Sequence, residues 1–297
     1  MTKRNIPSLE KRKEQYDLFL KDFENRPEAF RDDYPVYFKD IESAGISDMS
    51  KKDKEAYNSG AGGELKERNI NGKKFPPSML SVASSSRFCY LSLVNSDLSV
   101  FGIRKGSSRI KFEEKLPILD RGIPPHMDAC LEIEDKLYFF ECKCHELFDC
   151  HSIVLAESYF KKNLIVDRIF ANKEYKDKVK KYDDGNETHY RQYSPTILGV
   201  NENPRFDIKQ LITHIMGIQN KLRSANTNSA ELIYYYFIPK DVKDNKQIKE
   251  VIDELENEIK VIFAKIKDFI PEITLRFYVQ YSKVVETAGE DNTESRL

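Results

Sequence analysis

Apolar residues change their spacing along the chain, and each spacing predicts one kind of element. Apolar positions at helical spacing predict two amphipathic helices, at residues 206–223 and 245–270. A third helix is expected at residues 78–94, where apolar residues mix with serines. Runs that are rich in β-branched and aromatic residues and bounded by Pro, Gly or Asp predict five strands, at residues 109–119, 124–133, 136–144, 230–239 and 274–286.

The order of these elements predicts a mixed α/β fold with helices against a central sheet. It runs helix, three strands, helix, strand, helix, strand. Residues 1–55 are highly charged and predict an N-terminal helical arm, and residues 56–287 then form the core. We expect a helical insertion in this core at about residues 145–205 and a disordered tail at residues 288–297.

Composition is that of a soluble globular protein with material for a sizeable core. The 297 residues are 40% hydrophobic and 33% charged, with 48 Lys and Arg against 49 Asp and Glu. The net charge of −1 does not indicate a nucleic-acid binder, so any such surface must be a local patch. No run of about 18 apolar residues occurs, and the first residues lack the apolar core of a signal peptide. We therefore expect a cytoplasmic protein with no membrane partner.

Three charged residues interrupt two of the predicted strands. With a two-residue turn at Glu134–Asp135, Asp128 lies opposite Glu141. Like charges at roughly 4.5–5.5 Å repel each other, so two carboxylates placed in this way require a cation. Lys143 lies two residues beyond Glu141 and therefore on the same face. This face is expected to present all three groups together.

Hard oxygen ligands on this face suit Mg²⁺, with Mn²⁺ as a substitute. Asp128, Glu141 and the backbone carbonyl of Cys142 would hold the metal, while the Cys142 thiol points to the opposite face. Such a metal would polarise a phosphodiester and activate water. Lys143 would orient the nucleophile or neutralise charge that develops in the transition state. The pattern therefore predicts hydrolysis of a nucleic-acid backbone.

The same three charges also fit a surface ion cluster in which Lys143 bridges the two acids. Spacing alone does not separate the two interpretations. The register matters as well, because a turn one residue longer would place Asp128 and Glu141 on opposite faces.

The hairpin HMDACLEIEDKLYFFECK resembles the PD-(D/E)XK nuclease superfamily, which has the restriction-endonuclease-like fold. The first acid, the second acid and the lysine of the motif match Asp128, Glu141 and Lys143. Cys142 is the variable residue between the last two, and Met127 stands where the family usually has Pro. The resemblance covers roughly residues 60–285, without the insertion, and implies an αβββαβ core.

This resemblance implies further site residues and a partner. The family often supplies an additional acid from the helix before the first strand, and Glu64 follows a glycine turn there, with Glu67 as its competitor. The helix after the third strand often carries a Gln and a polar residue four positions later, here Gln210 and His214, although Tyr is more usual than His. The implied activity is Mg²⁺-dependent cleavage of duplex DNA, as in restriction or phage-defence endonucleases, many of which are homodimers.

Other interpretations stay open. A non-catalytic nucleic-acid-binding protein could keep the fold, and an RNA-cleaving relative could keep the site. The stretch CKCHELFDCH at residues 142–151 suggests zinc, but its C-x-C lies on a predicted strand, where buried free thiols are the simpler account. Residues 161–181 hold eight basic and three acidic residues and form either a nucleic-acid patch or a solvated helix face.

Overall fold

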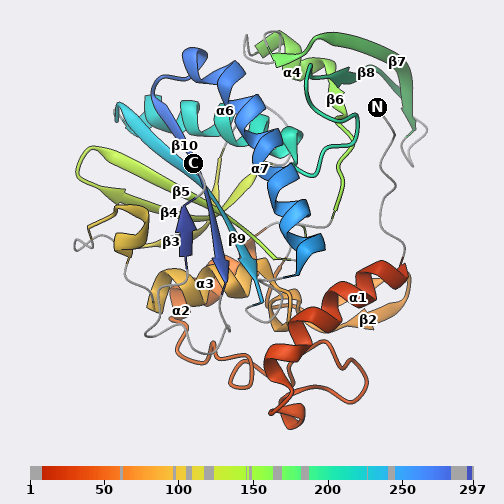
Figure 1. Ribbon diagram of the computed structural model, residues 1–297, viewed down its shortest axis with the longest axis vertical. Coiled ribbons are helices and arrows are strands. Elements are labelled where there is room, and N and C mark those ends of the chain that lie inside the picture. Colours follow the sequence, from red (N-terminus) through yellow and green to blue (C-terminus); the bar gives the residue numbers. More distant parts are fainter. Residues whose placement is uncertain are drawn as a thin grey trace.

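A six-stranded mixed sheet runs through the middle of the computed structural model, with helices on both faces (Figure 1). Its strands lie in the order β11-β10-β9-β5-β4-β3, in which β5, β9 and β10 are parallel and the other neighbours are antiparallel. The strands are β3 (Lys111–Lys115), β4 (His126–Ile133), β5 (Lys136–Lys143), β9 (Ser229–Ile238), β10 (Ile273–Tyr281) and β11 (Thr293–Ser295). The structure describes residues 9–60, 63–95, 98–104, 109–116, 124–144, 146, 149–162, 169–181, 187–225, 227–239, 245–281 and 293–295.

The predicted order of the core elements is confirmed. Helix α3 (Ser85–Asn95) precedes β3, β4 and β5, and α6 (Ile208–Ala225), β9, α7 (Lys246–Ile266) and β10 follow. Asn245 sets the start of α7, because its side chain accepts hydrogen bonds from the N–H groups of Gln247 and Ile248. The helix expected at residues 78–94 begins later than predicted, after a separate 3-10 turn. Within residues 56–287, 3-10 turns include η3 (Ser78–Leu80), η4 (Leu98–Phe101) and η7 (Lys267–Phe269).

The β4–β5 hairpin has the predicted register. Its pairs run from Ile133–Lys136 to Ala129–Phe140, as a two-residue turn at Glu134–Asp135 requires. Glu134 has a φ of 53°, the left-handed conformation that tight hairpin turns use. A slip of one residue would turn every side chain to the other face, so this register fixes the direction of Glu141.

Two layers of helices bury the two faces of the sheet. Helices α6 and α7 cover one face and share an apolar cluster with Phe139. The second face is covered by α3, and its apolar cluster contains Phe140. Two more helices join this second layer, α1 (Leu9–Leu20) and α2 (Lys51–Ser59). Because neighbouring residues of β5 alternate between the clusters, Glu141 faces α6 and Cys142 faces α3.

The expected N-terminal helical arm is helical only in part. Between α1 and α2 the chain forms two 3-10 turns, η1 (Lys21–Phe23) and η2 (Pro27–Ala29), followed by irregular turns. A short hairpin of β1 (Arg68–Ile70) and β2 (Lys73–Phe75) follows α2. Aromatic residues of the arm are buried in the cluster on the second face of the sheet, namely Phe19, Phe23, Phe30 and Phe38. The arm is therefore packed into the core.

The expectation of a helical insertion is wrong for most of the described residues. Among the described residues of the insertion, Glu157–Lys162 form the short helix α4 and Ile169 is helical as well. Most of the others lie in a three-stranded sheet of β6 (Leu155–Ala156), β7 (Asn172–Lys181) and β8 (Glu187–Thr196) or in irregular segments. In β7 the apolar residues Tyr175 and Val179 lie four apart, a spacing that also fits one face of a helix. Pairing with β8 along ten residues overrides that local preference.

Three expectations concern the C-terminal tail, the last predicted strand and the membrane. Of the tail expected to be disordered, Thr293–Ser295 pairs with β10 as β11, so these residues form a strand instead. The strand expected to continue to residue 286 ends at Tyr281, and residues 282–286 lie outside the described residues. No helix in the described part of the chain has the length and apolar character that a membrane crossing requires.

Candidate active site

Three carboxylates lie on neighbouring strands at a place where the pairing of the sheet is interrupted. The pairs of β4 with β5 stop at Ala129, so Asp128 and Glu141 do not pair with each other. The pairs of β3 with β4 omit Glu113 and Asp128, although they continue on both sides. The Asp128 carboxylate instead accepts a hydrogen bond from the Cys142 N–H, with 2.6 Å between Oδ2 and N. Where the strand pairing is interrupted, the Cys142 backbone N–H therefore bonds to the side-chain carboxylate of Asp128.

Glu141 is the centre of the site. It is only 4% exposed, and its Oε1 accepts hydrogen bonds from Lys143 Nζ at 2.6 Å and from Gln210 Nε2 at 2.7 Å. His214 Nε2 lies 3.8 Å from the other oxygen, Oε2. The fold thus brings together Glu141, Lys143, Gln210 and His214, four of the residues singled out in the sequence.

Helix α6 presents Gln210 and His214 from the same face, because residues four apart lie one above the other on a helix. The first turn of α6 is fixed by Asp207, whose Oδ1 accepts the Gln210 N–H at 2.9 Å. Tyr234 of β9 lies behind His214, with 3.4 Å between its hydroxyl and Nδ1. Burial lowers the pKa of His214, although the charge of Glu141 acts in the opposite direction. His214 is therefore a neutral neighbour of Glu141 at pH 7.

Glu113 belongs to the site, although no sequence pattern singled it out. It occupies the β3 position that lies opposite Asp128, with a φ of 53° that breaks the ladder there. Its Oε2 lies 3.2 Å from His126 Nδ1. A side chain on Gly60 would lie 2.4 Å from the same oxygen, so only glycine leaves room for the carboxylate. Glu113 lies here because of the register in which β3 pairs with β4. The sequence does not show this register.

Glu64 lies at the edge of the site, but in a turn after α2 and not on a helix. Its backbone N–H donates to the Tyr57 carbonyl at 3.0 Å, and its carboxylate accepts a hydrogen bond from the Ser78 hydroxyl. Its negative charge is one reason for the raised pKa of Glu113. Glu67, the alternative in the sequence, is exposed. Glu64 is therefore linked to the other acids by its electrostatic effect on Glu113.

Mutual repulsion marks this group of acids. Burial, followed by the charges of Glu64 and Glu141, raises the pKa of Glu113 to about 8. Burial and the charge of Glu141 likewise raise the pKa of Asp128 well above its ordinary value, against the opposing effect of Lys143. Because unpaired like charges are costly in a buried site, these carboxylates gain stability from a proton or from a cation.

Lys143 is the cation that the fold supplies. Burial opposes its charge, but the charges of Glu141, Glu146 and Asp128 outweigh burial and raise the pKa of Lys143 above its ordinary value. Its side chain is 13% exposed, and its ammonium group lies 2.6 Å from Glu141 Oε1. Lys143 is therefore protonated at pH 7.

The donor set fits a hard divalent cation in its chemistry. Several carboxylates repel one another here, and Asp128 keeps partial exposure, which gives an ion access. Within the described residues, however, no three His, Cys, Asp or Glu side chains are already gathered closely enough to hold a metal. The Cys142 carbonyl as a ligand stays a prediction.

The cysteine-rich stretch packs behind the site. Cys142 and Cys144 are buried free thiols in the cluster on the second face of the sheet, and Cys89 of α3 lies beside Cys142. Burial raises the pKa of the Cys142 thiol well above its ordinary value, and hydrogen bonding and repulsion by Cys89 raise it further. His145 lies outside the described residues. These thiols contribute to packing on the face opposite Glu141.

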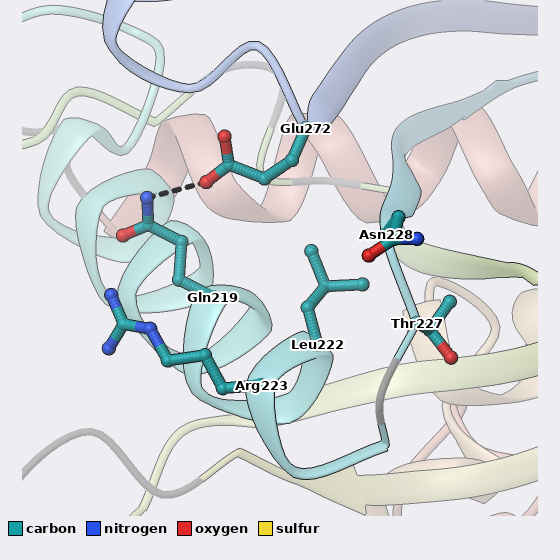
Figure 2. Close-up of a pocket in the computed structure, with 6 residues that line it drawn as sticks. All are labelled: Gln219, Leu222, Arg223, Thr227, Asn228 and Glu272. Carbon is teal, nitrogen blue, oxygen red and sulfur yellow. Dashed lines mark hydrogen bonds between the residues drawn. The ribbon is translucent and has the colours of Figure 1, made fainter.

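A pocket of about 300 Å³ lies elsewhere, at the last turns of α6. Figure 2 shows Gln219 donating to Glu272 beside Arg223, with 2.7 Å between Gln219 Nε2 and Oε1. Gln219 lies nine residues beyond Gln210, or roughly 13 Å along the helix. The pocket holds a single carboxylate and none of the acids described above, so we do not place the active site there.

Comparisons with known proteins give no match. No protein-family model, no curated protein and no solved structure matches this chain. The geometry itself offers several acids, a protonated lysine, an amide and a neutral histidine at one end of a sheet. Carboxylates are the ligands that hard divalent cations prefer, and a lysine can stabilise negative charge on a phosphate.

Proposed function

We propose that this protein is a Mg²⁺-dependent endonuclease that hydrolyses DNA phosphodiester bonds, with the restriction-endonuclease-like fold of the PD-(D/E)XK superfamily. The order of α3, the three strands β3 to β5, α6 and β9 supports this assignment, since it follows the αβββαβ plan. The acids and the lysine lie on β4 and β5 in the order that the motif requires. We place the protein among restriction or phage-defence endonucleases.

One observation carries the proposal. Gln210 Nε2 and Lys143 Nζ converge on Oε1 of Glu141, although Gln210 lies 69 residues away in the chain. The motif contains Glu141 and Lys143, and the resemblance implies Gln210 as a third residue of the same site. A surface ion cluster would explain the pairing of Lys143 with Glu141, but it would not explain a part-buried amide from a distant helix on the same oxygen.

Each residue of the candidate site would have its own role toward a bound DNA strand. Asp128 and Glu141 would hold the metal, with Glu113 and Glu64 beside them. Gln210 keeps the Glu141 carboxylate in one orientation, because the hydrogen bond fixes one of its two oxygens. Lys143 would place a positive charge next to the phosphate, where negative charge develops during hydrolysis. Bound Mg²⁺ would supply Lewis-acid polarisation of the phosphodiester.

Cleavage of several substrates in parallel tests the proposal. Plasmid DNA, linear DNA and RNA are incubated with Mg²⁺, Mn²⁺ or EDTA, using the wild-type protein and Glu141→Ala. We expect DNA fragments only with metal and only with the wild-type protein. Cleavage of RNA in place of DNA would favour the RNA-cleaving alternative, and binding of intact DNA under every condition would favour a non-catalytic protein. Products that persist with Glu141→Ala would contradict the assigned site.

A further inference from the structure

The hairpin of β7 and β8, here called the ribbon, has no role in the proposed site. Its ten residue pairs run without a break from Asn172–Thr196 to Lys181–Glu187. At about 3.3 Å per residue, the ribbon is roughly 30 Å long. In Figure 1 it lies at the outer edge of the molecule, beyond β6 and α4.

The outer half of the ribbon is exposed on both faces. Residues 174–179 of β7 and 187–191 of β8 are all exposed, including Tyr175 at 52%, Val179 at 47% and Tyr190 at 37%. Only the inner end is anchored, where the ring of Tyr193 lies 4.4 Å from that of Phe160. Beyond the short pairing with β6 the ribbon has two strands, and two strands alone are marginally stable in water. Its length and exposed aromatic side chains therefore point to a partner.

The charge of the ribbon points to a polyanion. Its two strands carry six basic and three acidic residues, whereas the whole chain has a net charge of −1. Lys176 and Lys178 project from one face together with Tyr190, which pairs with Lys178. On the other face, the guanidinium of Arg191 stacks on the ring of Tyr175 at 4.8 Å. Positive charge on an exposed, extended surface suits a phosphate backbone.

The shape favours duplex DNA over other nucleic acids. The major groove of B-DNA, about 12 Å wide, admits a two-stranded ribbon, whereas the minor groove is about 6 Å wide. The deep and narrow major groove of duplex RNA excludes such a ribbon. Single-strand binders stack bases on exposed aromatic faces, and Arg191 already occupies one face of the Tyr175 ring.

The base of the ribbon is connected to the candidate active site. The insertion leaves β5 directly after Lys143 and returns to the core at α6. His151 in the insertion lies 3.5 Å from Asp207, measured between Nδ1 and Oδ2. Asp207 in turn holds the N–H of Gln210, whose side chain contacts Glu141. The ribbon therefore starts from the end of the sheet that carries the acids.

We propose that the ribbon binds duplex DNA in the major groove and holds it for cleavage at the carboxylate site. This inference rests on the proposed nuclease function for the fate of the DNA, but binding can be measured separately from cleavage. Lys176 and Lys178 contact phosphates, and their contribution is independent of base sequence.

Binding is measured by fluorescence anisotropy in EDTA, with a labelled duplex of mixed sequence at several salt concentrations. All proteins carry Glu141→Ala, so that the DNA stays intact. The test variant adds Lys176→Gln and Lys178→Gln. The control adds Lys260→Gln and Lys267→Gln, which remove the same charge from α7 and from the 3-10 turn η7 that follows it. Thermal unfolding checks that every variant is folded.

We expect the ribbon variant to bind at least tenfold more weakly than the parent and to lose roughly two from the slope of log K against log salt. The control should keep the affinity and slope of the parent. Unchanged binding by the ribbon variant would overturn the inference, and its lysines would then serve to protect an edge strand. Tighter binding of single strands or duplex RNA would overturn it as well. Metal-dependent cleavage by the wild-type protein would leave the proposed function intact in each case.

Discussion

At the scale of single residues, the candidate site depends on the groups that meet at Glu141. Lys143 is two residues away on the same strand, so its position follows from strand periodicity. Gln210 comes from a helix that the chain reaches only after the insertion, and only folding brings it to within 2.7 Å of Glu141. Glu113 could not be predicted, because nothing in its local sequence distinguishes it from its neighbour Glu114.

Replacement of Lys143 tests the part of the site that acts on the phosphate. We expect Lys143→Ala to lower the rate of DNA cleavage by about 10²–10³, the usual effect of removing one group that stabilises transition-state charge. Single-turnover cleavage rates in Mg²⁺ measure this effect. Lys111→Ala removes an exposed lysine from β3 and serves as the control. Equal rates for the two variants would remove Lys143 from the proposed chemistry.

Glu113 gives the metal-free protein a pH-dependent stability. Its folded pKa of about 8 exceeds the ordinary value of 4.5, so the folded state binds this proton more tightly than the unfolded state does. The resulting stability, on the order of 5 kcal/mol, is complete below about pH 4.5 and is lost as pH rises through about 8.

The variant Glu113→Gln lacks this proton, so its stability should fall less between pH 5 and pH 8. Urea unfolding in EDTA at several pH values measures the difference. Asp128 also has a raised pKa, so a smaller slope should remain. Parallel curves for the two proteins would show that Glu113 is charged in the folded state at neutral pH.

At the scale of elements, periodicity predicted the core strands and helices but not the insertion. Helix α7 has eight buried residues at helical spacing, a pattern that fits only a helix. Strand β9 is buried along nearly its whole length, and its continuous apolar run indicates a central strand. Strand β7 has only two apolar residues, and its pairing with β8 decides its conformation. Exposed elements with few apolar residues are therefore the ones that local patterns predict least well.

A buried ion network links three parallel strands. Glu231 of β9 is 4% exposed and lies 2.5 Å from Lys136 Nζ of β5 and 3.0 Å from Arg276 Nε of β10. We expect Glu231→Ala to lower the free energy of unfolding by about 1–3 kcal/mol, because it leaves two cations without their acid. Glu250→Ala on α7 removes an exposed acid at 3.9 Å from Lys246 and should cost less than about 0.5 kcal/mol. Urea midpoints compare them, and equal shifts would contradict the network.

At the scale of the whole molecule, the site lies where both helical layers and three strands meet. Glu141 faces α6, the Cys142 thiol packs toward α3, and Gly60 after α2 leaves room for Glu113. No single element contains the site, so its acids repel one another only when the chain is folded. Metal binding and folding should therefore be coupled.

Mg²⁺ should raise the thermal stability of the whole protein. At about ten times the dissociation constant we expect a rise of about 2–4 °C in Tm. The rise should be larger at pH 8.5 than at pH 6, because Glu113 and Asp128 must lose protons before the cation binds. Differential scanning fluorimetry measures it, with Asp128→Asn as the variant that should not respond. An equal rise in that variant would place the metal elsewhere.

The sequence by itself determined the order of the core elements, the register of the β4–β5 hairpin and the shared face of Glu141 and Lys143. These depend on periodicity and turn length, which are local properties of the chain. Only the tertiary structure decided that Gln210 contacts Glu141, that Glu113 lies opposite Asp128 and that the insertion forms a basic ribbon. Each of these depends on contacts between segments far apart in the chain, and such contacts leave no local pattern in the sequence.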